Sequence, residues 1–139
     1  MPMLDQAYTR NLRANLHKYQ DIRREVNKEC DDILYHAKRA IFAMQRDDPS
    51  AAREILTSLD ARLITLQKRY GRIPKITNEG FYKAALEEYV EARLLYQFIN
   101  QGKIGKITKI KVDDEVYLAG LCDVPGELFR LAIQAGRRR

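Results

Sequence analysis

The first fifty residues carry an apolar pattern that neither proline nor glycine interrupts. No Pro or Gly lies between Pro2 and Pro49, and apolar residues recur there in alternating steps of three and four. That spacing is typical of one face of an amphipathic helix. We therefore predict a helix from about Asp5 to Arg46, with at most one break, long enough for bundle or coiled-coil-like packing. The residues of its apolar face are Leu12, Leu16, Tyr19, Ile22, Val26, Cys30, Ile33, Ala37, Ile41 and Met44.

The remaining glycines and prolines delimit three further helices. Asp48 followed by Pro49 is a favourable helix start, because Asp caps free amides and Pro suits the first helical position. We predict this helix to end at Gly71, a third to begin near Asn78, and a fourth to follow Asp113 or Asp114 and end before Gly136. The segment 103–112, with isoleucine at every third position, is predicted to be an ordered loop. The prediction is an all-α fold, a bundle of about four long helices in a single domain spanning residues 1–139.

Composition favours a cytoplasmic protein with an anionic partner. The chain has 25 Lys and Arg against 19 Asp and Glu, a net charge of +6. Cys30 and Cys122 lack metal-ligand spacing and are interpreted as reduced thiols of the core. No apolar run approaches the roughly 18 residues that a membrane span requires, and no signal peptide is evident.

Acidic residues in the third predicted helix lie where apolar ones are expected. The segment 84–99 is apolar almost all round its circumference, which is typical of a largely buried helix. Glu88 and Glu91 nevertheless fall on one narrow stripe of it, with Glu87 at the edge. A solvated face would be broader and mixed in sign.

The fourth predicted helix shows the same anomaly. Asp123 and Glu127 lie four residues apart and share one face of an otherwise apolar helix, with Arg130 beside them. Gly120 and Gly126 carry no side chain, so another backbone or a ligand could approach closely there.

Three interpretations of these acids remain open on spacing alone. Buried carboxylates pair with cations, take up protons or bind a metal, so two acid pairs on packed helices could share one Mg²⁺ or Mn²⁺, which all-oxygen ligands favour. They could equally be structural ion pairs, either with basic residues of neighbouring helices or, for Asp123, with Arg130 on the same helix. A di-iron carboxylate centre is disfavoured, because it needs Glu-x-x-His repeats and neither His17 nor His36 follows a Glu by three. Both histidines are interpreted as surface or packing residues.

Two segments resemble the translin family. They are ALEEYVEARLLYQFI at 85–99 and, more closely, YLAGLCDVPGELFRLAI at 117–133, with a weaker match in KRAIF at 38–42. The resemblance implies an all-α protein that assembles into closed oligomers around a cavity and binds single-stranded or structured RNA and single-stranded DNA. Members usually continue with further helices after the segment matching 132–136, so we expect a C-terminally shortened or archaeal-type member.

Within that family the chain is most similar to the nuclease-bearing, X-type subunits (translin-associated factor X). Their Mg²⁺-dependent endoribonuclease site maps onto a complete set of four acids, which the resemblance assigns as catalytic and metal-binding residues: Glu88, Glu91, Asp123 and Glu127. The alternative is a non-catalytic RNA- and DNA-binding scaffold of the same family. The expected partners are RNA, single-stranded DNA, and either further copies of the chain or translin-type subunits. The basic residues predicted to contact nucleic acid are Arg130, Arg23, Arg24, Lys38 and Arg39.

Overall fold

The computed structural model describes residues 3–138, so residues 1, 2 and 139 of the predicted domain lie outside the described part. Its elements are all helical, and no strand occurs within residues 3–138, which confirms the predicted all-α bundle. A short helix adds to the four long ones that were predicted. The helices are α1 (Gln6–Gln45), α2 (Pro49–Tyr70), α3 (Pro74–Thr77), α4 (Gly80–Gln101) and α5 (Asp114–Arg137).

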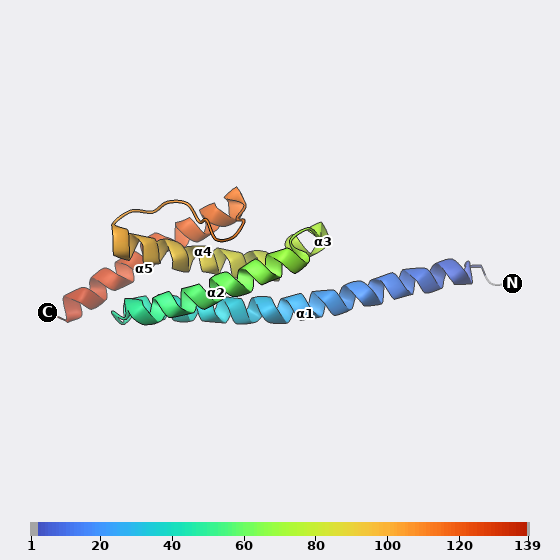
Figure 1. The fold of residues 1–139 in the computed structure, drawn as a ribbon, viewed down its shortest axis with the longest axis horizontal. Coiled ribbons are helices and arrows are strands. Elements are labelled where there is room, and N and C mark those ends of the chain that lie inside the picture. Colours follow the sequence, from blue (N-terminus) through green and yellow to red (C-terminus); the bar gives the residue numbers. More distant parts are fainter. Residues whose placement is uncertain (1–2, 139) are drawn as a thin grey trace.

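The helix α1 runs unbroken for 40 residues. The Asp5 carboxylate caps it by accepting hydrogen bonds from the backbone amides of Ala7 at 2.8 Å and Tyr8 at 3.1 Å. Its buried positions begin only at Val26. The second half of α1 therefore packs in the bundle, while the first half projects beyond the other helices (Figure 1).

Local signals decide where the next helices begin. Asp48 caps α2 by accepting from the amide of Ala51 at 3.1 Å, as predicted. The third long helix was predicted to begin near Asn78, and α4 begins two residues later, at Gly80. Before it, Pro74 opens the short helix α3, and the amide of Asn78 donates to the carbonyls of Pro74 and Ile76.

The segment between α4 and α5 is an ordered loop, as predicted, and two glutamines hold it. The Gln97 amide donates to the carbonyl of Lys106 at 2.9 Å and accepts from the amide of Gly105 at 2.9 Å. The side-chain amide of Gln67 on α2 likewise donates to the carbonyl of Lys111 at 2.7 Å and accepts from its backbone amide at 3.0 Å. Because both amides fix the backbone, the isoleucines of the loop can turn to the core, where Ile110 is buried.

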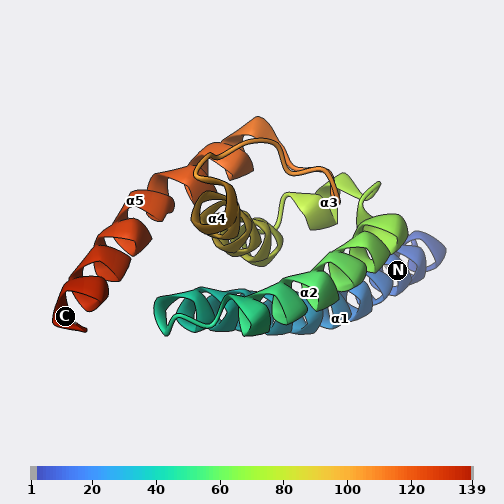
Figure 2. The same ribbon diagram turned by 60° about the vertical axis from the view of Figure 1, so that its left-hand side comes forward.

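The helix α4 is the centre of the bundle. It packs on α1, on α5 and less extensively on α2 (Figure 2). Tyr89 and Arg93 of α4 bind the carboxylate of Asp60 on α2, which satisfies a charge that burial would otherwise penalise. The prediction that α4 is largely buried is confirmed between Tyr82 and Leu95, and this burial brings Glu91 into the interior.

The helix α5 crosses α4 at Gly120. A Cβ atom built there would lie 2.6 Å from Val90 Cγ1 and 2.9 Å from the Glu87 carbonyl oxygen, so the two helices touch with no room for a side chain. Gly126 faces open space instead. The helix continues through Pro125 and beyond Gly136, so the predicted end before Gly136 is wrong.

Candidate functional site

The two acidic stripes meet where α4 and α5 pack against the last turns of α1. Glu88 and Glu91 come from α4, and Asp123 and Glu127 come from α5, one and two turns beyond the contact at Gly120. Glu91 is only 6% exposed and Glu127 only 7%, Glu88 is half-buried, and Asp123 is exposed. The cluster is therefore reachable from solvent on the Asp123 side.

The acids disturb one another electrostatically. Burial, followed by repulsion from the other three carboxylates, raises the pKa of Glu91 to about 8. Burial also raises the pKa of Glu88, and the positive charge of Lys38 on α1 partly offsets this increase. At neutral pH the carboxyl of Glu91 is therefore mostly protonated.

Glu127 is the acid with the most direct partners. Its Oε1 pairs with Arg130 Nη1 at 2.5 Å, one turn along α5. Its Oε2 accepts a hydrogen bond from the side-chain amide of Gln45, the last residue of α1. Arg130 therefore flanks the acids as predicted, but it pairs with Glu127 rather than with Asp123.

Structural ion pairing accounts for only one of the four acids. Within residues 3–138, Glu88, Glu91 and Asp123 have no Lys, Arg or His nitrogen within 4.0 Å of a carboxylate oxygen. Four crowded carboxylates are a donor set suited to a hard cation such as Mg²⁺. Over the same residues, however, no three acidic, His or Cys side chains converge closely enough to hold an ion. The structure shows the placement of the acids, and their role as ligands stays a prediction.

Two of the five basic residues predicted to contact nucleic acid lie beside the acids, and the other three do not. Lys38 and Arg130 lie beside the acids, and Arg39 is exposed on α1. Arg23 instead pairs with Glu79 at 3.0 Å and lies 5.3 Å from the ring centroid of Phe81, towards the far end of the bundle. Arg24 is exposed beside Asp21. The structure thus joins two of the five basic candidates to the acids and gives Arg23 a local packing role.

The sequence interpretation did not include Gln45. The spacing could have predicted its burial, because Gln45 follows Ile41 by four residues and so continues the buried face of α1. A polar side chain at the end of such a stripe is buried only with a partner, and here the partner is Glu127.

A groove lies elsewhere, between α1 and α2, and ion pairs line it. Arg62 binds Glu29 at 2.9 Å and also Asp32, and Arg69 lies 3.4 Å from Glu25. These pairs tie α1 to α2, so their charges are already satisfied. We assign this groove a structural role.

Comparison with known proteins identifies the fold family. The sequence model of the translin family matches residues 21–138. The chain belongs to the translin family. No curated protein matches the sequence. Among solved structures, the chain superposes on a crystal structure of apo-NeC3PO with a TM-score of 0.83 at 25% identity, covering 99% of this chain and 72% of that one. A crystal structure of AfC3PO gives 0.82 at 24% identity, covering 92% and 66%.

This membership confirms the family resemblance, including the all-α fold that it implied. The closer similarity to the X-type subunits stays a prediction. Within the part of the chain that the structure describes, no helix is long and apolar enough to cross a membrane. Of the two thiols, Cys30 is buried as expected, whereas Cys122 is exposed, so its predicted place in the core is wrong.

Proposed function

We propose that the chain is a Mg²⁺-dependent endoribonuclease subunit of the translin family. The observation that carries the proposal is a set of four neighbouring carboxylates on α4 and α5. Within residues 3–138 three of them lack a basic partner, and one has its pKa raised to about 8. An arrangement that raises the free energy of the folded protein in this way is typical of a functional site. A bound divalent cation would relieve the repulsion.

The proposed roles follow from position. Glu88, Glu91, Asp123 and Glu127 would hold the cation, which supplies charge stabilisation and a more acidic bound water for phosphodiester hydrolysis. Lys38 and Arg130 flank the acids and suit the phosphate groups of RNA. The exposed side of the cluster, at Asp123, is where the strand would enter.

Cleavage of a single-stranded RNA tests the proposal. Asp123→Asn should abolish Mg²⁺-dependent cleavage while RNA binding is kept or strengthened, because the amide removes a ligand charge and a repulsion from phosphate. Asp114→Asn, an exposed acid of the first turn of the same helix, is the matched control and should cleave like the parent. Equal cleavage by Asp123→Asn and the parent would contradict the assignment.

A non-catalytic scaffold that binds RNA and single-stranded DNA is the second candidate. Two observations favour it. Arg130 forms an ion pair with Glu127, and within residues 3–138 no three acidic side chains lie close enough together to hold a metal ion. RNA binding by the parent without cleavage in either Mg²⁺ or Mn²⁺ would support the scaffold over the nuclease.

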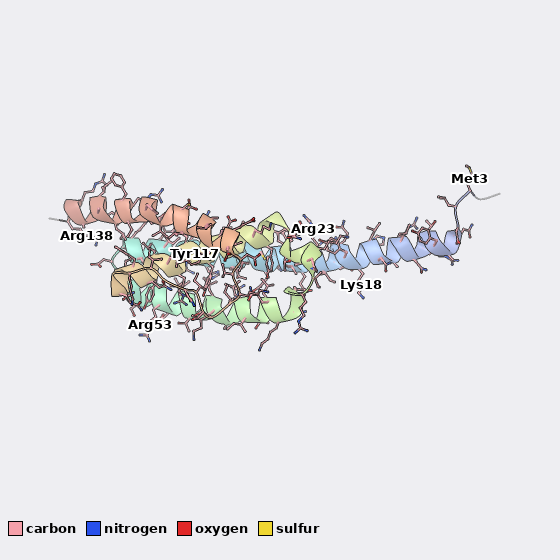
Figure 3. All side chains as sticks on the ribbon, turned by 90° about the horizontal axis from the view of Figure 1, so that it is seen from above. Met3, Lys18, Arg23, Arg53, Tyr117 and Arg138 are labelled. Atoms are coloured by element: carbon pink, nitrogen blue, oxygen red, sulfur yellow. The ribbon has the colours of Figure 1, made fainter. Side chains whose placement is uncertain are left out.

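We also propose that the projecting half of α1 packs against another translin-type subunit, in the first instance a second copy. Leu12 and Leu16 are 44% and 59% exposed on one stripe of this segment, and Figure 3 shows side chains around it with no neighbouring helix. The buried thiol of Cys30, whose pKa burial raises to about 12, suits the cytoplasm as the proposed location.

A further inference from the structure

Gln45 makes a specific contact to the candidate site from a third helix. It is the last residue of α1, it is 7% exposed, and its side-chain Nε2 donates to Glu127 Oε2. Its backbone carbonyl separately accepts from Arg138 Nη2 at 3.2 Å. Gln45 therefore ties α1 to α5 and to its C-cap at two points, and only the contact with Glu127 involves its side chain.

The two partners of Glu127 differ in charge and in solvent exposure. The amide of Gln45 is neutral, so it fixes one carboxylate oxygen without cancelling the negative charge. The guanidinium of Arg130 cancels that charge through Oε1, yet its side chain is 63% exposed. An exposed ion pair is weak and easily broken, whereas the buried hydrogen bond to a charged group is costly to lose.

We propose that Gln45 is a positioning residue that holds Glu127 for a divalent cation, and that Arg130 is the counter-ion the cation displaces. This inference rests on the proposed function. With a cation bound, Glu127 Oε2 would stay on the Gln45 amide and Oε1 would be free to act as a ligand. Arg130 would then be available to a phosphate group of the RNA. Outer partners that orient a ligand in this way commonly change metal affinity by about 10- to 100-fold.

Titration with Mn²⁺ alone, followed by the electron paramagnetic resonance signal of the free ion, tests the inference without any measurement of cleavage. Gln45→Met keeps the length and the apolar stem of the side chain but removes the donor. It should weaken Mn²⁺ binding by about 10- to 100-fold. Gln67→Met, the same substitution at the amide that holds Lys111 in the loop, should leave the Mn²⁺ affinity unchanged.

Arg130→Ala provides a second variant at an exposed position, where folding is not at risk. Removal of the competing counter-ion should tighten Mn²⁺ binding, the opposite of the effect at Gln45. Melting in EDTA shows whether Gln45→Met is folded. If the parent binds Mn²⁺ and Gln45→Met binds it equally well, or if Arg130→Ala binds it more weakly, the inference is overturned and the proposed function stands. A folded parent that binds no Mn²⁺ overturns both.

Discussion

The charge at Glu91 should make the metal-free protein less stable as the pH rises. The folded state raises the pKa of this carboxyl from 4.5 to about 8, so it holds a proton that the unfolded chain has released. The stability contributed by that proton is complete below about pH 4.5 and is lost as the pH rises through about 8. Because one pKa unit corresponds to about 1.4 kcal/mol, the whole difference is on the order of 5 kcal/mol.

Glu91→Gln removes this dependence while it keeps the shape of the side chain. The amide donates a hydrogen bond as the protonated acid does, so parent and variant should have similar free energies of unfolding at about pH 5. In EDTA at about pH 9 the variant should be more stable, by up to about 5 kcal/mol. That gain corresponds to a rise in melting temperature of the order of 10 °C for a chain of this size.

Urea unfolding followed by circular dichroism, in EDTA at several pH values, measures the effect directly. Glu54→Gln is the control, because this acid is exposed on α2 and should leave the pH dependence unchanged. If Glu91 were instead the charged member of a structural pair, the amide would strand a buried cation and destabilise the fold by about 3–5 kcal/mol. A variant that melts well below the parent at about pH 9 would refute the reasoning.

Four further predictions follow from the same structure. Mn²⁺ affinity should rise as the pH is raised towards 8, because the cation must displace the proton held by Glu91, and calorimetry should detect the proton released. Gly120→Ala should destabilise the fold by about 1–3 kcal/mol in urea unfolding, since its Cβ would meet Val90. Replacing Leu12 and Leu16 by Lys should dissociate oligomers in light scattering without lowering the helical content. RNA affinity should fall steeply with added salt in a filter-binding assay, because phosphate contacts release counter-ions.

Much of the fold was predictable because its signals are local. The spacing along α1, the cap at Asp48 and the two acidic stripes each depend on residues within a few turns of one another. The short helix α3 was not predicted, because a single helical turn is too short to show an apolar period.

The candidate site was predictable only in part, because its partners come from distant segments. Spacing indicated that each acid pair shared a face, but the meeting of the two pairs depends on the close contact at Gly120, some thirty residues along the chain from Glu88. The contact of Gln45 with Glu127 joins residues that are 82 positions apart. The pairing of Arg130 with Glu127 rather than Asp123 depends on side-chain rotamers, which spacing does not determine.

A crystal of the protein soaked in Mn²⁺ tests the central claim most directly, because the anomalous signal locates the ion without reference to activity. The account predicts one strong peak between α4 and α5, within ligand distance of carboxylate oxygens from both helices, with Arg130 moved away from Glu127. A fully soaked crystal with no peak at this position, and with the ion pair between Arg130 and Glu127 intact, would contradict it.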